Sequence, residues 1–137
     1  MSVLALDHVN LRSRDPKRTL DFFRDVLLMK VGAPPGSTGD GPGGWVYDDG
    51  DRPILHVGSA DQRYPMDEIF HFEPAHGSGA VHHVALACSD FEGIRTQLQS
   101  LALDFTENDV QQMSLRQLFV TDPNGILFEL NFRNGQA

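Results

Sequence analysis

His8 to Asp15 reads His-Val-Asn-Leu-Arg-Ser-Arg-Asp, and His83 to Asp90 reads His-Val-Ala-Leu-Ala-Cys-Ser-Asp. The second stretch repeats the pattern of the first after 75 residues. The chain also carries Ile54-Leu55-His56 near the end of its first half and Leu127-Phe128-Glu129 at the matching place in its second half. Self-similarity at a fixed offset indicates an internal repeat. The sequence therefore predicts two similar modules, each with two polar side chains that can bind a metal ion.

Each half predicts one strand, one helix and three further strands. An aspartate follows the first strand of each half and is a good helix N-cap, and in the first half Pro16 adds a proline at the first helical position. In the first half we expect a strand at 4–13, a helix capped by Asp15 that runs through about Leu28, and strands at 30–33, 44–48 and 53–59. We expect Gly32 to be the residue that terminates the helix. In the second half we expect a strand at 81–87, a helix capped by Asp90, and strands at 104–107, 116–121 and 126–132. The buried helix positions should be Leu20, Phe23, Val26 and Leu27 in the first helix and Ile94, Leu98 and Leu101 in the second.

The predicted fold class is therefore α+β, with two tandem βαβββ modules at 4–59 and 81–132 in a single domain, 1–137. Residues 34–44 are rich in glycine and proline and predict a mobile connecting loop. Residues 60–80 join the modules and are rich in aromatic residues. A loop this long in a small domain is typical of a lid or of a dimer contact, and the sequence leaves both open. His71 and His76 fall in this loop, where exposure is the default.

Composition narrows the class of partner. The chain has 137 residues and a formal net charge of −8, which argues against nucleic acid and against an anionic membrane surface. No run of apolar residues is long enough to span a membrane, and the first residues lack the features of a secretory signal, so we expect a cytoplasmic protein. The single cysteine, Cys88, agrees with a reducing compartment and is expected to be a small buried residue. A small-molecule ligand is the expected partner.

Strand alternation places the candidate metal-binding side chains on one face of each module. His8 should share a face with Asn10 and Arg12, whereas Val9 and Leu11 point to the face that packs on the helix. The same alternation puts His56, His83 and Glu129 on the face away from the helices, and it predicts that His82 points away from His83. Each of these residues could have a purely structural role instead of binding a metal ion: a histidine on a strand can be a hydrogen-bonded core residue, and Glu129 can pair with Arg116.

The chain resembles the vicinal oxygen chelate superfamily, which includes glyoxalase I, extradiol ring-cleavage dioxygenases, methylmalonyl-CoA epimerase and the fosfomycin- and bleomycin-resistance proteins. The similarity covers nearly the whole chain. It rests on Asp7-His8-Val9-Asn10-Leu11 through Phe22-Phe23, on His82-His83-Val84-Ala85-Leu86, and on Phe119-Val120-Thr121-Asp122-Pro123-Asn124-Gly125 through Phe128-Glu129-Leu130. These motifs are specific for the superfamily but not for one activity.

The resemblance implies an open, curved, eight-stranded cup that holds a divalent metal ion. It places the metal ligands at His8, His56, His83 and Glu129, of which His8, His83 and Glu129 match the two-histidine, one-carboxylate set that suits Fe²⁺. Ni²⁺, Zn²⁺ or Mn²⁺ are alternatives. His56 departs from glyoxalase I, which carries a carboxylate or amide there, and it corresponds to a non-ligand histidine of extradiol enzymes. The expected catalytic residues are therefore His56 and Glu129, and the expected substrate-binding residues are Asn10, Arg12 and Tyr64.

Several functions remain open at this point. The favoured one is extradiol-dioxygenase-like oxygenation of a substrate with vicinal oxygen atoms, and the main alternative is a glyoxalase I-like lyase or isomerase. A thiol transferase would need cationic side chains for an anionic substrate, and Arg12, Arg14 and Arg116 are the candidates. A non-catalytic, drug-binding protein of the bleomycin-resistance type is a further alternative. We expect a homodimer, and the sequence leaves open whether the two modules of one chain or of two chains share a site.

Overall fold

The repeat is visible in the computed structural model as two units, residues 1–74 and 75–137. The structure describes residues 1–33, 36 and 39–134. The predicted loop 34–44 therefore lies partly outside the described residues, at positions 34, 35, 37 and 38. The boundary between the units falls within the predicted connecting loop 60–80.

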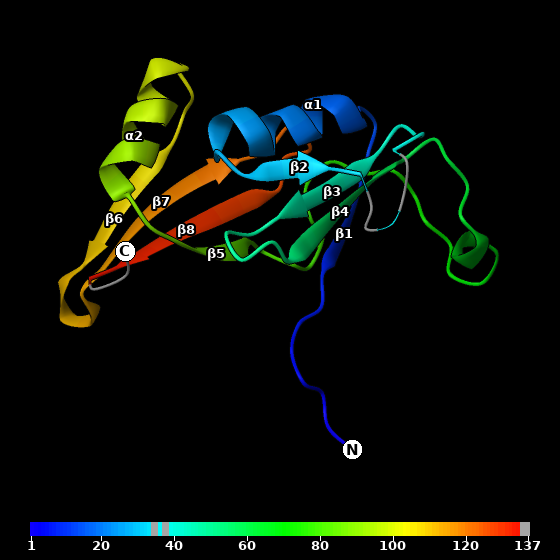
Figure 1. Cartoon of the computed structure of the whole chain (residues 1–137), viewed down its shortest axis with the longest axis horizontal. Coiled ribbons are helices and arrows are strands. Elements are labelled where there is room, and N and C mark those ends of the chain that lie inside the picture. Colours follow the sequence, from blue (N-terminus) through cyan, green and yellow to red (C-terminus); the bar gives the residue numbers. More distant parts are fainter. Residues whose placement is uncertain (34–35, 37–38, 135–137) are drawn as a thin grey trace. The chain divides into compact units, whose positions relative to one another are not determined.

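The first unit contains a four-stranded sheet with the strand order β1-β4-β3-β2. Its elements are β1 (Val9–Ser13), α1 (Pro16–Asp21), a π-helical turn η1 (Phe22–Val26), β2 (Lys30–Gly32), β3 (Gly44–Tyr47), β4 (Pro53–Ser59) and a 3₁₀ turn η2 (Pro65–Glu68). β1 runs parallel to β4, whereas β3 is antiparallel to both β2 and β4. Figure 1 shows α1 lying across one face of this sheet, where it contacts β3 and β4.

The second unit repeats this topology with the order β5-β8-β7-β6. Its elements are β5 (Val84–Cys88), α2 (Phe91–Ser100), β6 (Thr106–Val110), a 3₁₀ turn η3 (Gln111–Met113), β7 (Leu115–Thr121) and β8 (Leu127–Arg133). β5 is parallel to β8, and the other pairs are antiparallel, as in the first unit. The predicted α+β fold with two βαβββ modules is thus confirmed.

Both predicted helix caps are confirmed. The carboxylate of Asp15 accepts a hydrogen bond from the backbone N–H of Arg18 at 3.0 Å, and Asp90 accepts one from Gly93 at 3.0 Å. Each bond satisfies one of the backbone donors that have no partner in the first turn of a helix.

The predicted first strand of each module begins too early. β1 starts at Val9 rather than at residue 4, and β5 starts at Val84 rather than at residue 81. The length of the partner strand limits how early the first strand can begin. Val9 pairs with Leu55, so Asp7 would stand beside the first residue of β4, and residues before it would have no ladder to join. The same limit acts on β5, whose partner β8 begins only at Leu127.

Helix termini also differ from the prediction. Leu28 takes the left-handed conformation with φ 57° directly after the first helix, so Gly32 does not end that helix but closes β2. Leu101 caps the end of α2 and is 44% exposed, so it does not belong to the buried stripe. The buried positions of α2 are Phe91 and Leu98. β6 begins two residues later than predicted, at Thr106.

The core of each unit follows strand alternation. Leu55 and Val57 are buried on either side of His56, and Phe128 and Leu130 are buried on either side of Glu129. Phe23, from η1, is fully buried in the first unit. Within the described residues, no helix combines the length and apolar character that crossing a membrane requires.

Candidate functional site

The first unit brings His8, Trp45 and His56 together. Trp45 lies opposite His56 in the β3–β4 ladder, and the two rings stack with centroids 4.6 Å apart and planes 10° from parallel. His8, directly before β1, meets the same tryptophan edge-on at 4.9 Å, and its ring centroid lies 6.4 Å from that of His56. These contacts support the prediction that His8 and His56 share one face of the sheet.

Asn10 determines which nitrogen of His56 carries a proton. The side-chain nitrogen Nδ2 of Asn10 lies 3.0 Å from Nδ1 of His56 and 3.2 Å from the backbone oxygen of the same residue. A carbonyl oxygen only accepts, so the amide of Asn10 presents its N–H groups to His56. Nδ1 of the ring is then an acceptor, and the proton of the neutral imidazole is on Nε2. His56 therefore presents an N–H group, not a lone pair, at Nε2.

The environment of His56 also favours the neutral ring. Desolvation by burial is the largest cause that lowers the pKa of His56 below its usual value, and the electrostatic effects of His8 and Arg12 lower it further. A neutral ring with a fixed tautomer can donate one hydrogen bond from Nε2 to a bound ligand.

His8 has the opposite arrangement. Its Nδ1 lies 2.5 Å from a carboxylate oxygen of Asp7. A carboxylate only accepts, so Nδ1 carries a proton, and in the neutral form of the ring the lone pair is on Nε2. A histidine whose other nitrogen donates to a carboxylate is the usual arrangement for a metal ligand.

The second unit brings His83 and Glu129 together. Nε2 of His83 lies 3.6 Å from Oε2 of Glu129. Both carboxylate oxygens also accept side-chain amide hydrogen bonds: Oε1 from Gln117 at 2.9 Å and Oε2 from Asn131 at 3.1 Å. Arg116, the predicted alternative partner of Glu129, lies elsewhere: its guanidinium is over the ring of Phe91 at 3.5 Å and so faces α2. The structure therefore contradicts the alternative in which Glu129 pairs with Arg116.

His82 does not point away from His83 as predicted. The Nδ1 atoms of the two rings are 2.9 Å apart, and the rings meet at 87°. Strand alternation does not apply here, because both residues precede the first residue of β5. The contact occupies Nδ1 of His83 and leaves Nε2 toward Glu129.

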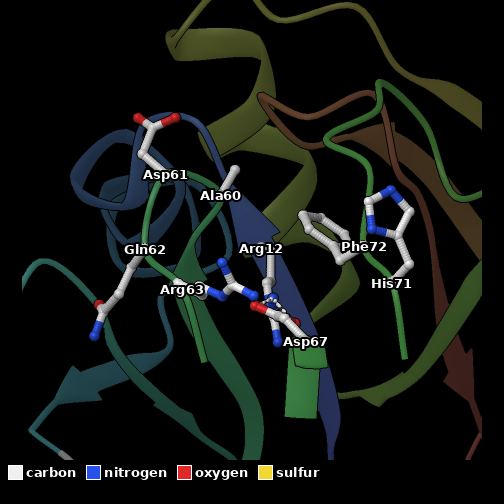
Figure 2. A pocket seen from close by; sticks show the side chains of 8 residues that line it. All are labelled: Arg12, Ala60, Asp61, Gln62, Arg63, Asp67, His71 and Phe72. Carbon is white, nitrogen blue, oxygen red and sulfur yellow. Dashed lines mark hydrogen bonds and ion pairs between the residues drawn. The ribbon is translucent and has the colours of Figure 1, made fainter. Parts of the chain in front are cut away.

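Arg12 faces a cavity of about 340 Å³, which Figure 2 shows from close by. Its Nη1 lies 2.7 and 2.8 Å from the two carboxylate oxygens of Asp67, and its guanidinium lies over the rings of Tyr64 at 4.2 Å and Phe72 at 4.9 Å. The lining residues are Arg12, Ala60, Asp61, Gln62, Arg63, Asp67, His71 and Phe72. Arg12 therefore holds the segment that follows β4 against β1, and an anionic substrate would have to compete with Asp67 for it.

Tyr64 lies near His56. Both residues line a second cavity of about 180 Å³, together with glycines between positions 39 and 44. The hydroxyl oxygen of Tyr64 accepts a hydrogen bond from the backbone N–H of Ser59 at 3.2 Å. Of the three predicted substrate-binding residues, Asn10 contacts His56 directly, Tyr64 shares a cavity with it, and Arg12 faces the other cavity.

The four residues predicted as metal ligands thus occur as one pair in each unit, His8 with His56 and His83 with Glu129. In the part of the chain that the structure describes, no group of three or more His, Cys, Asp or Glu side chains is arranged to hold a metal ion. The second pair fits a shared ion: two ligands roughly 2.1 Å from one metal ion are about 3.0 to 3.4 Å apart, close to the 3.6 Å between His83 and Glu129. The donor types fit a divalent transition metal.

Five residues near the candidate site were given no role from the sequence: Asp7, Trp45, Asp67, Gln117 and Asn131. Asp7 appeared only as the first residue of a family motif. The other four reach the site through strand pairing or through a loop contact, and such contacts have no local sequence signature.

Comparison with known proteins identifies the family. The sequence profile of the Glyoxalase/Bleomycin resistance protein/Dioxygenase superfamily matches residues 5–130. The chain therefore belongs to this superfamily, as the resemblance predicted. No curated protein matches the sequence significantly.

Solved structures share the fold at low sequence identity. The genomically encoded fosfomycin resistance protein FosX from Listeria monocytogenes superposes with a TM-score of 0.68 and 14% identity, covering 98% of this chain and 97% of that one. Lactoylglutathione lyase from Agrobacterium tumefaciens gives a TM-score of 0.67 and 16% identity, covering 96% and 95%. A protein from the mobile metagenome of V. Pseudocholerae gives a TM-score of 0.64 and 18% identity, covering 96% of both chains.

Proposed function

We propose that this chain is a divalent-metal-dependent enzyme and that it oxygenates a small molecule with two adjacent oxygen atoms, as extradiol dioxygenases do. The proposed ligands are His8, His83 and Glu129, which together make the two-histidine, one-carboxylate set of non-haem Fe²⁺ enzymes. A mutant of FosX was crystallised with Mn(II) and dihydroxypropylphosphonic acid, so a protein of this fold can hold a divalent ion together with a ligand that has vicinal oxygens.

The observation that carries the proposal is the hydrogen bond from Asn10 to Nδ1 of His56. Because it assigns the proton to Nε2, His56 is unsuited to be a fourth ligand. In His8 and His83 it is Nδ1 that is engaged, by Asp7 and by His82, so Nε2 is the nitrogen of each ring that would bind the ion. Three ligands leave coordination positions for a bidentate substrate and for oxygen. A glyoxalase-type site would instead use all four positions as ligands.

The chain's own residues then have distinct roles. A bound metal ion would act as a Lewis acid toward the two substrate oxygens. His56 donates a hydrogen bond from Nε2 to an oxygen of the substrate that carries negative charge, and Asn10 keeps the ring in this tautomer. Trp45 holds the plane of the ring by stacking, and Tyr64 lines the cavity beside it. Glu129, held by two amides, serves as a ligand rather than as a mobile base.

The test is metal content by elemental analysis after anaerobic purification. We expect about one iron per chain in the wild type and in His56→Ala, and loss of the iron in His83→Ala and Glu129→Ala. His71→Ala is a matched control, because His71 is an exposed histidine that pairs with Glu73. Oxygen uptake with catechols should then require the metal and should fall strongly in His56→Ala.

Other outcomes would favour the alternatives. Nickel, zinc or manganese at the same stoichiometry, with turnover in the absence of oxygen, would favour a lyase or isomerase. Loss of metal in His56→Ala would make His56 a ligand and contradict its proposed role. No metal after reconstitution would leave a binding protein.

We also propose that the protein is a homodimer. Each four-stranded sheet has two edge strands, and exposed edges favour association. Light scattering on the purified protein measures the mass directly, and a monomer of 15.2 kDa would contradict the proposal.

A further inference from the structure

A chain of four polar side chains crosses the second sheet and ends at the Glu129 carboxylate. Asn108 on β6 donates to Oε1 of Gln117 at 2.8 Å. Gln117 on β7 donates through Nε2 to Glu129 and also to Oδ1 of Asn131, at 2.9 Å in each case. Asn131 in turn donates to the second oxygen of Glu129.

The direction of every bond in this chain follows from the carboxylate. An ionised carboxylate only accepts, so Gln117 and Asn131 must both turn their nitrogens toward Glu129. The oxygen of Gln117 then faces Asn108, which must present its nitrogen. Each contact in the chain therefore joins a donor to an acceptor, and the orientation of each amide depends on the next.

The sheet does not require this network for its own stability. β7 and β8 are already joined by an uninterrupted antiparallel ladder from Leu115 to Thr121. Gln117 and Asn131 are both buried, each with 8% exposure. A buried polar network stabilises a fold little more than apolar side chains of the same volume would, and it becomes costly when one member is lost.

The repeat supplies an internal comparison. Asn131 lies two residues after Glu129, and the matching position two residues after His56 is Gly58. A side chain there would collide with the hydroxyl of Tyr64, since a Cβ would lie 2.6 Å from it. The module that carries the carboxylate thus has the amide next to it, and the module that carries a histidine has none at that position.

We propose that Gln117 and Asn131 are positioning residues that hold the Glu129 carboxylate in place for a divalent cation. The inference rests on the proposed function, since it assigns Glu129 as a ligand. Bonding both oxygens to fixed amides restricts the rotation of the glutamate side chain before the cation arrives. The Glu129 side chain is then already ordered in the free protein, and this ordering strengthens binding of the cation.

The test compares the affinity of the metal-free protein for Mn²⁺, measured by calorimetry, in the wild type and in Gln117→Met. Methionine has similar length but donates no hydrogen bond. We expect binding to weaken by roughly 10- to 100-fold, as is typical when the partner of a metal ligand is lost. Asn108→Ala, on the exposed edge strand, removes only the residue that orients Gln117, so it should weaken binding less and should fold even if Gln117→Met does not.

Thr19→Val is the matched control for lost stability. Thr19 is fully buried in the first unit and donates to Ser13 at 2.8 Å, so its replacement also removes a buried hydrogen bond. It should lower Tm and leave Mn²⁺ affinity unchanged. If the wild type binds Mn²⁺ and both the Gln117 and Asn108 variants bind it equally well, the positioning role is wrong and the proposed function stands. If the wild type binds neither Mn²⁺ nor Fe²⁺, the proposed function itself fails, and this inference fails with it.

Discussion

Asn10 donates its side-chain N–H to Nδ1 of His56 at 3.0 Å, and the two residues stand opposite each other in the parallel β1–β4 ladder. The backbone register that pairs them also brings the amide to the ring. The contact selects one tautomer of His56, and the tautomer decides whether this residue can bind a metal ion or donate a hydrogen bond.

The first prediction concerns this tautomer. In ¹⁵N NMR spectra of the wild type at neutral pH, His56 should show a proton on Nε2 and none on Nδ1. In Asn10→Ala the amide donor is lost, so a mixture of both tautomers should be seen. The exposed His71 serves as a reference ring, and a proton on Nδ1 of His56 in the wild type would contradict the role proposed for Asn10.

The lowered pKa of His56 has a consequence for stability. Burial, together with His8 and Arg12, keeps the folded-state pKa below the usual value of 6.5. The unfolded chain therefore takes up a proton at a higher pH than the folded chain does. The contribution of the neutral ring to stability is present above pH 6.5 and is lost as the pH falls toward the folded-state pKa. Urea unfolding at pH 7.5 and 5.5 should show a smaller pH dependence in His56→Asn than in the wild type.

The second prediction concerns the Arg12–Asp67 ion pair. Asp67→Asn should release the segment after β4 and make residues 60–74 several-fold more sensitive to limited proteolysis. The pKa of Asp67 is lowered first by the hydrogen bond from the backbone N–H of Tyr64 and then by Arg12. A lowered pKa means that the stabilisation is present above the usual value of 3.8 and disappears as the pH falls through the folded-state pKa. The wild type should therefore become protease-sensitive only in strong acid.

Glu68→Gln is the control for this experiment. Glu68 pairs with Arg63, and both side chains are well exposed. Exposed pairs contribute little, so proteolysis should stay close to the wild-type rate. Equal sensitivity of the Asp67 and Glu68 variants would show that Arg12 does not hold the segment.

The third prediction concerns Asp122 in the turn between β7 and β8. Its Oδ1 accepts from the backbone N–H groups of Asn124 and Ile126, both at 2.9 Å. Asp122→Ala leaves these donors without that acceptor and should cost about 1–3 kcal/mol of unfolding free energy. Urea denaturation measures the loss. Asp49→Ala, in the exposed turn of the first unit, should change stability by less than about 0.5 kcal/mol, and similar losses in both variants would refute the argument.

The fourth prediction concerns Cys88. Burial raises the pKa of its thiol to about 11, so almost none of it is ionised at pH 8. The native protein should react with a thiol reagent many times more slowly than the protein in denaturant. Rapid reaction in the native state would mean that β5 opens readily or that the thiol is more exposed than the structure indicates.

Local sequence signals account for most of the fold. The repeated histidine and aspartate positions indicated two modules, and Asp15 and Asp90 correctly marked the helix starts. Alternation around His56 and Glu129 predicted which neighbours are buried. These features depend on residues close in the chain, where strand and helix periodicity apply directly.

The contacts that give the candidate site its chemistry depend on tertiary structure. The lengths of β4 and β8 limit how early β1 and β5 can begin, and the wrong expectation for His82 arises because that residue precedes β5. Asn10 meets His56, and Gln117 meets Glu129, only because backbone registers set adjacent strands side by side. The sequence alone determined the modules and the kinds of side chain they carry. Tertiary structure decided which nitrogen of His56 is protonated and what holds the Glu129 carboxylate, because hydrogen bonds between distant residues have no local signature.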